Sequence, residues 1–432
     1  MQSELDSLRL RVKDLESENA RLSSLLSNCK CSKECRNVDT GIGSAEEIQG
    51  LKLHTDDKMN QKVKGFSNKI RSMHQYSKRY VALKVMYFGQ RFFGFASEGQ
   101  MDPTIESEIF RALEKTRLID GTKKDLQYSR CGRTDKGVSS VGQVISLFLR
   151  SKLNDADTGS GCPQEFQMKE LYEGELDYVR ILNKELPKDI RVMGWCPVPV
   201  DFSSRFSCLS REYKYFFWRE NLNIKAMENA GKKFIGEHDF RNFCKMDAAN
   251  VHSFKRCITE FKIFPCAERF DEDQLWVVKI KGTAFLWHQV RCIVAVLFLI
   301  GKGLESPDLI EILLDTEKIP KKPQYVMAPE IPLVLQSCNF EALKFVCSSG
   351  SRKALLDHLE MECKSYKIQS AIFHEAFLSC SLSENDEILL EDKPKKPPSH
   401  IPLMLRPTEP SYEERCVKLN SQLKVKKKNP LS

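Results

Sequence analysis

Strand-like and helix-like segments alternate between residues 79 and 345, and this alternation restricts the chain to few fold classes. Segments rich in β-branched and aromatic residues, which have the composition of strands, are 80–87, 143–149 and 275–280. After the first of them, Thr104 precedes a run in which Ile105, Ile109 and Leu113 recur at helical spacing, so a capped helix is expected. Strands that alternate with helices predict a mixed α+β fold.

Other parts of the chain are less regular. Residues 176–218 are expected to form strands separated by turns. Residues 284–300 are expected to form a largely apolar helix that Gly301 ends. After residue 345 the hydrophobic pattern weakens.

We expect five segments along the chain. These are a coiled coil at 1–28, a flexible linker at 29–77, an N-terminal subdomain at 78–200, a C-terminal subdomain at 201–345, and an extension with a basic tail at 346–432. A chain of 432 residues is longer than one hydrophobic core usually serves, so two subdomains are expected within the folded region.

The first segment has apolar residues at the alternating three- and four-residue spacing of a coiled coil. They are Leu5, Leu8, Val12, Leu15, Leu22 and Leu26. Asn19 shares a heptad position with Leu5, where a polar side chain fixes the register and favours a parallel pair of helices. A single solvated helix is the alternative, and three heptads leave both interpretations open.

The charge balance permits an acidic partner without requiring one. Lys and Arg together exceed Asp and Glu by eight, and the isoelectric point is near 8.6. Basic runs at 393–398 and 424–428 are interpreted as nuclear-import signals, RNA-backbone contacts or a solvated tail. We expect the protein to occur in the nucleus and cytoplasm.

Cysteine usage indicates free thiols. Sixteen cysteines are scattered along a chain that lacks the pattern of a secretory signal, so a reducing compartment is expected. Cys29, Cys31 and Cys35 have no fourth ligand at zinc-finger spacing. The apolar stretch at 293–300 is far shorter than the roughly 20 residues that span a bilayer. We therefore expect a soluble protein with no metal and no cofactor.

Asp135 stands out on chemical grounds. It lies between Arg133 and Lys136 on a loop flanked by Gly132 and Gly137. Glycines allow close approach of a substrate, and neighbouring cations favour the ionised carboxylate. This composition suits a nucleophile or a phosphate-reading loop, although composition alone favours an ordinary turn aspartate.

Six motifs then follow one another in a fixed order. They are Tyr87-Phe88-Gly89 with Phe93-Gly94-Phe95, the loop Cys131-Gly132-Arg133-Thr134-Asp135-Lys136-Gly137-Val138, Leu182-Asn183 with Leu186-Pro187, and residues 202–215, 237–243 and 284–291. The series resembles the motifs of the TruA-type tRNA pseudouridine synthases. Two positions depart from the family pattern, because Ala96 replaces a usual Gln and Ser204 a usual Ala.

The resemblance implies a fold, an activity and partners. The fold would have two mixed α/β subdomains, a central largely antiparallel sheet, and a catalytic cleft between the subdomains. The coiled coil and residues 243–247 and 322–328 are most similar to the eukaryotic branch that modifies positions 38 and 39 of the tRNA anticodon arm. The implied partners are that RNA and a second copy of the chain, because family members form homodimers. No metal or small-molecule cofactor is implied.

The resemblance also implies roles for individual residues. Asp135 would attack C1′ of the target nucleotide or remove a ribose proton to give a glycal. Tyr213 would stack on the target base and take the proton from C5. Arg291 lies on an apolar helix, so it needs a buried counter-charge, and the resemblance makes Asp135 that partner. Arg133 would fill the space that the flipped nucleotide leaves.

Further basic side chains are candidates for RNA-phosphate contacts, with solvated charges as the alternative. They are Arg91, Lys136, Arg205, Arg211 and Lys245. His238 and His288 are expected to be packed or hydrogen-bonded and to take no part in proton transfer.

Three functional classes remain in view. They are a catalytic synthase for these or other tRNA or mRNA positions, a relative that binds RNA without catalysis, and a coiled-coil scaffold with a globular head. The presence of Asp135, Tyr213 and Arg291 favours catalysis.

Overall fold

A computed structural model of the chain describes residues 76–97, 101–153, 174–266, 274–382 and 400–428. These residues belong to the compact unit Ile70–Ser432. The coiled coil predicted at 1–28, most of the linker with its three cysteines, and the basic run at 393–398 lie outside the described residues.

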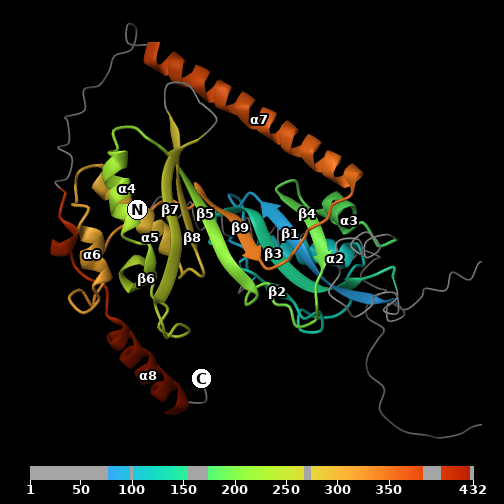
Figure 1. Cartoon of the computed structure of the whole chain (residues 1–432), viewed down its shortest axis with the longest axis horizontal. Helices are drawn as coiled ribbons and strands as arrows, with labels where there is room; N and C mark the ends of the chain where they lie inside the picture. Colours follow the sequence, from blue (N-terminus) through green and yellow to red (C-terminus); the bar gives the residue numbers. More distant parts are fainter. Residues whose placement is uncertain (1–75, 98–100, 154–173, 267–273, 383–399, 429–432) are drawn as a thin grey trace, which may run out of the picture. The chain divides into compact units, whose positions relative to one another are not determined.

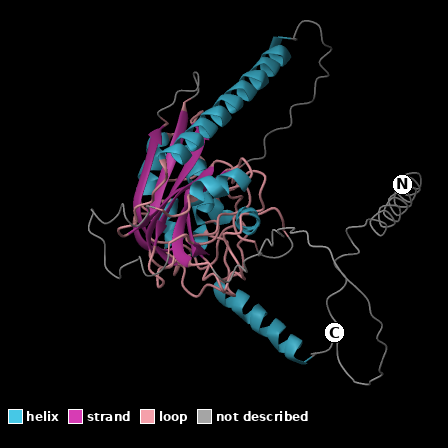
Figure 2. Ribbon diagram, turned by 90° about the vertical axis from the view of Figure 1, so that its right-hand side faces the viewer, coloured by secondary structure: helices cyan, strands magenta, loops and turns pink. Residues whose placement is uncertain are grey.

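Nine strands in the described part of the chain form one sheet. They are β1 (Lys78–Tyr87), β2 (Ser129–Arg130), β3 (Ser139–Arg150), β4 (Ile190–Pro197), β5 (Cys208–Trp218), β6 (Gly236–Asp239), β7 (Lys255–Pro265), β8 (Leu275–Gly282) and β9 (Leu333–Phe340). Their order is β4-β1-β3-β9-β5-β8-β7-β6, and β2 pairs with β3 (Figure 1). Figure 2 shows the strands as one twisted layer.

Every pairing but one among these described strands is antiparallel. The exception joins β3 to β9 in parallel, with Ser139 opposite Val334 and Ser140 opposite Leu335. Because β9 also pairs with β5, it connects the strands of the N-terminal subdomain to those of the C-terminal subdomain. The predicted α+β fold with a central, largely antiparallel sheet is confirmed.

Helices complete each subdomain. They are α2 (Ile105–Lys115) and α3 (Tyr178–Glu185) beside β1 to β4, and α4 (Ile224–Lys232), α5 (Gln289–Gly301) and α6 (Leu309–Leu314) beside β5 to β8 (Figure 1). The predicted cap of α2 is present, because the Thr104 side chain accepts a hydrogen bond from Ser107 N while the Ser107 side chain accepts from Thr104 N. None of the helices in the described residues is long and apolar enough to cross a membrane.

Alternation along β1 distributes side chains between two cores. Val81, Leu83 and Val85 are buried against α2 and α3, whereas Tyr80 and Ala82 are buried on the opposite face of the sheet. Each fully buried aliphatic side chain of this size stabilises the fold by about 1.5–3 kcal/mol. A third core surrounds α5, which is apolar on nearly all sides and therefore lies inside the protein.

Two predicted elements differ in the structure. The N-terminal part of 176–218 is the helix α3, because the Asp177 side chain caps it and Tyr178 and Leu182 bury one face. The helix expected at 284–300 begins at Gln289, because His288 has a left-handed backbone with φ of +61°. Gly301 is the last residue of that helix, close to where its end was expected.

The C-terminal extension contains more structure than its sequence pattern indicated. It forms the 34-residue helix α7 (Ser349–Leu382) and the helix α8 (Tyr412–Lys428). Between them Leu403 is fully buried in the C-terminal core, and Lys322 pairs with Glu409. Part of the extension therefore belongs to the folded C-terminal subdomain.

Candidate active site

The loop that carries Asp135 connects β2 to β3 and is fixed by backbone hydrogen bonds. Phe95 N donates to Thr134 O over 3.1 Å, and Gly137 N donates to Phe92 O over 3.3 Å. Both bonds join the loop to the segment that follows β1. The backbone on each side of Asp135 is thus held before any substrate arrives, which suits a catalytic group.

Two glycines make this close packing feasible. A Cβ atom on Gly89 would lie 2.1 Å from Val138 O, so no other residue fits there without movement of the backbone. Gly137 has φ of +81°, and a Cβ atom on it would lie 2.6 Å from Glu330 Cγ. The motif glycines therefore allow the Asp135 loop to contact both the residues that follow β1 and the segment before β9.

The carboxylate of Asp135 is partly buried and has two ring nitrogens beside it. Trp287 Nε1 donates a hydrogen bond of 3.1 Å to Asp135 Oδ1, and His288 Nε2 lies 3.5 Å from the same oxygen. Burial raises the pKa of Asp135 to about 6, although the nearby Arg291 charge and the Trp287 hydrogen bond oppose that rise. The main charges that favour ionisation are those of Arg291 and Lys245 rather than those of the adjacent Arg133 and Lys136, and they do not outweigh burial.

Arg291 is buried near Asp135 and pairs elsewhere. Its Nε donates to Ala328 O over 2.7 Å, and its Nη2 contacts Glu330 Oε2 at 2.8 Å. The expected need for a counter-charge is confirmed, but the partner is Glu330, and the prediction of a direct pair with Asp135 is wrong. Arg291 acts on Asp135 through its electric field instead.

The two histidines behave differently. His238 Nε2 lies 3.1 Å from Ile235 O, as expected for a hydrogen-bonded residue. His288 is packed as expected, but it lies against Asp135, and its Nδ1 has no hydrogen-bond partner among the described residues. Burial, together with the Arg291 charge, lowers the pKa of His288 to about 4, so its ring is neutral at pH 7.

Tyr213 lies on β5, opposite Ile280 of β8 and Leu335 of β9. Its ring packs edge-to-face on Phe285 with centroids 5.1 Å apart. Burial raises the pKa of the phenol well above its ordinary value, so Tyr213 stays protonated at neutral pH. The charge of Asp135 is among the causes of this rise, so the two side chains lie within electrostatic range of each other.

Three exposed cations, each a candidate for RNA contact, lie over exposed aromatic rings. Lys136 Nζ is 4.8 Å from the Phe93 ring, Arg205 Cζ is 5.3 Å from the Phe206 ring, and Lys245 Nζ is 4.2 Å from the Trp287 ring. We call these three the cation–aromatic pairs. Arg133 is exposed on the same loop as Asp135. Such pairs combine charge for phosphates with faces on which bases stack.

Two other cations considered for RNA contact have partners within the protein. Arg91 forms an ion pair with Asp189, with Nε 2.6 Å from Oδ2. Arg211 donates to backbone carbonyls, namely those of Thr283, Arg205, Cys131 and Cys208. Arg211 therefore supports the structure of the site.

Trp287 and Glu330 are site residues that the sequence motifs did not single out. Trp287 occupies a variable position in the motif at 284–291, and Glu330 lies outside the motifs. The sequence around Asp135 did not indicate a role for Trp287 or Glu330, because the contacts of these two residues join segments far apart in the chain.

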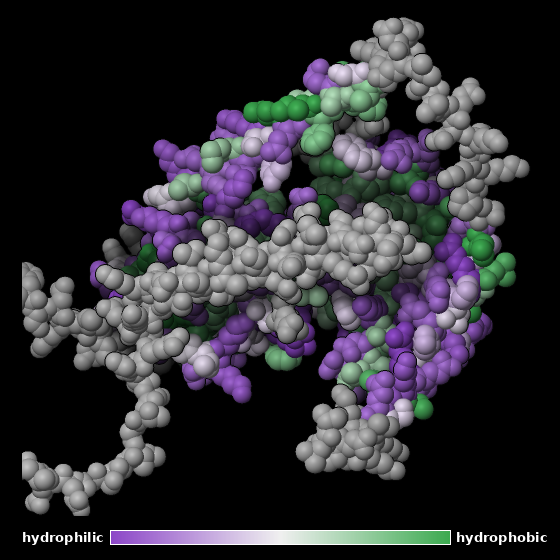
Figure 3. Space-filling view, turned by 180° about the vertical axis from the view of Figure 1, so that it is seen from behind, coloured by the Kyte–Doolittle hydropathy of each residue, from purple (hydrophilic) through white to green (hydrophobic). Residues whose placement is uncertain are grey.

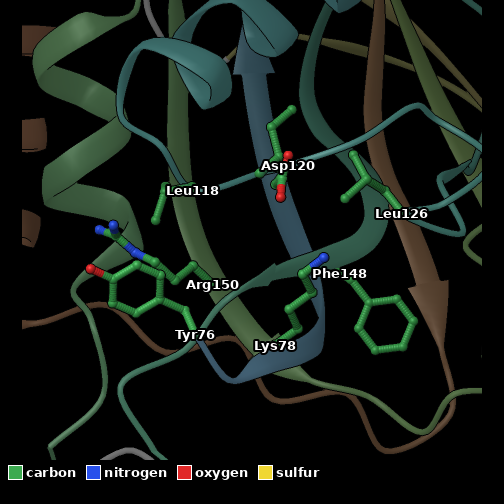
Figure 4. A pocket seen from close by; sticks show the side chains of 8 residues that line it. Tyr76, Lys78, Leu118, Asp120, Leu126, Phe148 and Arg150 are labelled. Carbon is green, nitrogen blue, oxygen red and sulfur yellow. The ribbon is translucent and has the colours of Figure 1, made fainter. Parts of the chain in front are cut away.

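A small pocket lies away from this site (Figure 4). Its walls come from the start of β1, the end of β3 and the loop after α2, with Lys78, Leu118, Phe148 and Arg150 among its lining residues. Asp135 precedes the opposite end of β3. This pocket is therefore separate from the Asp135 loop.

Comparisons with known proteins identify the family. A family profile described as tRNA pseudouridine synthase matches residues 230–341. A human protein named tRNA pseudouridine(38/39) synthase is 39% identical over 382 residues, which cover 86% of this chain and 74% of that protein. The chain belongs to the tRNA pseudouridine synthase family. The resemblance stated from the motifs is thus confirmed.

Other members of the tRNA pseudouridine synthase family extend the match. The Saccharomyces cerevisiae tRNA pseudouridine(38/39) synthase is 38% identical over 74% of each chain. The tRNA pseudouridine synthase A of Thermococcus sibiricus is 31% identical and is matched over 99% of its length by 69% of this chain. The profile match includes Trp287, His288, Arg291 and Glu330, and the Asp135 loop lies N-terminal to it.

Proposed function

We propose that this pseudouridine synthase isomerises uridines 38 and 39 of the tRNA anticodon arm, with Asp135 as the nucleophile. The names of the human and yeast relatives support the target positions. The observation that carries the role of Asp135 is its position: a partly buried carboxylate on a fixed loop, hydrogen-bonded by Trp287 and close to the Arg291 charge.

The reaction breaks the N1–C1′ bond of uridine, turns the uracil and joins it to C1′ through C5. An ionised Asp135 either attacks C1′ or removes a ribose proton to give a glycal. A pKa near 6 leaves the carboxylate largely ionised at pH 7 and more basic than an ordinary aspartate. Both routes therefore benefit from the burial of Asp135.

Tyr213 is assigned to stacking on the target base. Its neutral phenol favours this role over removal of the C5 proton, which would require a phenolate. Arg291, held by Glu330 and Ala328 O, keeps a positive charge near Asp135. Arg133 is assigned to the space that the flipped nucleotide leaves.

The cation–aromatic pairs are assigned to binding the RNA, with Lys136 and Arg205 as phosphate contacts. Their charges would contact the backbone while the rings of Phe93, Phe206 and Trp287 stack on splayed bases. Recognition by shape and backbone is expected to dominate, since phosphate contacts position an RNA without reading its sequence.

Release of tritium from uridine labelled at C5 tests the proposal. The substrate is a tRNA anticodon stem-loop, and the variants are Asp135→Asn and, as a matched control, the exposed Asp201→Asn. We expect release from the wild type and the control and none from Asp135→Asn. Equal release from Asp135→Asn and the wild type would exclude Asp135 as nucleophile.

Two alternatives are a synthase with other target positions and a relative that binds RNA without catalysis. Mapping pseudouridine in host tRNA and mRNA, with and without the protein, distinguishes them. Loss of pseudouridine at other positions would indicate different targets. Unchanged pseudouridine combined with RNA binding would indicate a non-catalytic relative. We expect loss at positions 38 and 39.

We also propose that the enzyme is a homodimer. α7 is anchored near its start, where Leu355 is buried and Glu362 contacts Lys188. Beyond that point its large apolar side chains are exposed, including Phe373 and Phe377, and hydrophobic side chains are visible along this helix in Figure 3. An exposed apolar surface of this kind suits a protein interface.

Light scattering on the full chain tests the dimer. We expect a dimer that survives deletion of residues 1–28 and dissociates when Phe373 and Phe377 are both replaced by Ser. A monomeric full chain would contradict the proposal. A dimer lost on deletion of residues 1–28 would assign pairing to the coiled coil.

For the cell, we propose residence in both nucleus and cytoplasm, on the basis of the basic runs at 393–398 and 424–428. A fluorescent fusion with the lysines of both runs changed to Gln should lose its nuclear fraction. Unchanged distribution would contradict a role for these runs in import.

A further inference from the structure

Three cysteines from three distant parts of the chain meet beneath the active-site loop. Cys131 begins the nucleophile loop, Cys208 begins β5, and Cys338 lies on β9. Their Sγ atoms all lie within 4.8 Å of one another. We call these residues the thiol triad. Neither the proposed reaction nor any motif role assigned above uses them.

The triad is enclosed by apolar side chains. Cys131 and Cys208 are 3% and 8% exposed, and the core around them includes Tyr80, Val144 and Phe340. All three residues are free cysteines in the structure. Buried thiols of this kind are shielded from oxidants in the solvent. If they ionise, the clustered thiolates repel one another and need a nearby positive charge to offset their own.

A positive charge is supplied by Arg211. Its Nη2 donates to Cys131 O over 3.1 Å, and its Nη1 donates to Cys208 O over 3.4 Å. The guanidinium therefore lies against the backbone of two of the three cysteines. It would offset one negative charge at the triad.

We propose that the thiol triad binds one soft, thiolate-seeking metal ion, either Zn²⁺ or Cu⁺. With metal–sulfur bonds of about 2.3 Å, sulfur atoms around one ion lie roughly 4 Å apart, and the Sγ atoms of the triad, all within 4.8 Å of one another, need at most a small movement to reach this separation. Thiolates are the ligands that select these two ions. On binding, each thiol loses its proton to solvent.

The charges balance with Zn²⁺. Three thiolates around a divalent ion carry one net negative charge, and Arg211 lies beside them to offset it. The described residues offer no fourth His, Cys, Asp or Glu at this spacing, so Zn²⁺ would complete its tetrahedron with water. Cu⁺ would need only the three thiolates.

The site would serve as a cross-link within the enzyme. Cys131 lies four residues before Asp135, and the other two cysteines lie on strands of the C-terminal half of the sheet. A bound ion would therefore fasten the nucleophile loop to β5 and β9. It would fix the position of Asp135 without contacting substrate.

Metal titration of the full-length, reduced protein tests the inference. The apo-protein receives Zn²⁺ or Cu⁺ in separate arms, and Co²⁺ in a third arm reports thiolate ligation through its charge-transfer absorption. A parallel set carries Cys29→Ser, Cys31→Ser and Cys35→Ser together, so that those cysteines do not contribute. We expect one ion per chain at the triad in both sets and a rise in thermal stability.

Single substitutions locate the ion. Cys208→Ser and Cys338→Ser should each weaken metal affinity by more than about 100-fold, because loss of outer-shell partners alone costs 10–100-fold. Cys196→Ser is the matched control, since Cys196 is buried in the same core but lies outside the triad. It should bind metal as the wild type does.

Three outcomes would overturn the proposal. One is absence of metal uptake and of the cobalt absorption in the set that lacks the three N-terminal cysteines. Another is equal affinity in Cys208→Ser, Cys338→Ser and Cys196→Ser. The third is a disulfide within the triad of the protein as purified, seen as a mass lower by about 2 Da and located by peptide mapping to two of the three cysteines. The wild-type titration needs no variant to fold, and tritium release stays an independent test of Asp135.

Discussion

The indole nitrogen of Trp287 donates a hydrogen bond of 3.1 Å to the carboxylate of Asp135, across 152 positions of sequence. The bond joins the residues that lead into α5 to the loop that leads into β3. Burial raises the pKa of Asp135, and this hydrogen bond is one of the two main effects that lower it. The other is the charge of Arg291. Trp287 therefore helps to set the pH at which Asp135 ionises.

Trp287→Phe should move the acidic limb of the rate profile to higher pH. The change removes a donor that lowers the pKa of Asp135, so this pKa should rise above about 6. A hydrogen bond to a charged group contributes about 1.5–3 kcal/mol, which corresponds to a loss of roughly 10- to 100-fold in kcat/KM near pH 6. Tritium release between pH 5 and 8.5 measures it. Trp218→Phe serves as control, and an unmoved limb in Trp287→Phe would contradict the assignment.

Glu330→Gln should move the same limb in the opposite direction. The Glu330 charge raises the pKa of Asp135, and the Gln carbonyl can still accept from Arg291. We expect the limb at lower pH, with a loss of stability of about 1–3 kcal/mol because Arg291 loses its counter-charge. The measurements are the pH profile and chemical denaturation. A shift to higher pH would show that Glu330 acts on Asp135 chiefly through Arg291.

Asp135→Asn should abolish activity and stabilise the fold at neutral pH. Burial raises the pKa of Asp135 from 3.8 to about 6, so the folded state holds this proton more tightly than the unfolded state. Stability therefore falls as pH rises between about 4 and 6, by up to about 3 kcal/mol. Asn cannot ionise and avoids this loss. Thermal unfolding should show a higher Tm for the variant at pH 7.5 and nearly equal values at pH 4; equal values at both would contradict the raised pKa.

Ser204→Ala should stabilise the protein without loss of activity. Ser204 is fully buried, and its hydroxyl has no hydrogen-bond partner among the described residues. A buried unsatisfied polar group costs about 1–3 kcal/mol, and Ala removes it while it adds no bulk. Denaturant unfolding measures the gain. The control is Ser97→Ala at an exposed position of the other subdomain, because the hydroxyl of the neighbouring Ser203 is hydrogen-bonded. A destabilised Ser204→Ala would contradict the prediction and would indicate an ordered water at the hydroxyl.

Lys136→Ala and Lys245→Ala should each reduce the salt dependence of RNA binding. A phosphate contact releases counterions, so its removal should lower the slope of log K against log salt by about 0.7–0.9. Lys318→Ala is the control, since Lys318 pairs with Asp315 on the surface after α6. Filter binding of an anticodon stem-loop at several salt concentrations measures the slopes. Equal slopes in all proteins would remove these two lysines from the interface.

Local chemistry explains what could be predicted from the sequence. The cap at Thr104 and the glycine-flanked loop of Asp135 depend on residues a few positions apart, so their patterns indicated the structure correctly. The buried charge of Arg291 likewise required a counter-charge wherever the fold supplied one. Identifying that partner as Glu330 needed the packing of α5 against the segment before β9.

Other features depend on tertiary structure and left little trace in the sequence. The Trp287 contact with Asp135 exists because α5 and the β2–β3 loop meet through the fold. α7 was not predicted, because its apolar residues are spread around the helix and most of them face solvent. The turn at His288 shortened α5, and a left-handed histidine has no distinct sequence signal.

The parallel pairing of β3 with β9 has a consequence for the order of events during synthesis. β9 ends at residue 340, after every other strand of the described sheet has been made. Asp135 can therefore leave the ribosome long before the strand that unites the two halves of the sheet. β9 lies between β3 and β5, and Glu330, the partner of Arg291, is made just before it. The two halves of the sheet consequently stay unjoined in the nascent chain until the last strand of the described sheet is made, and pairing over so long a sequence separation is expected to be slow.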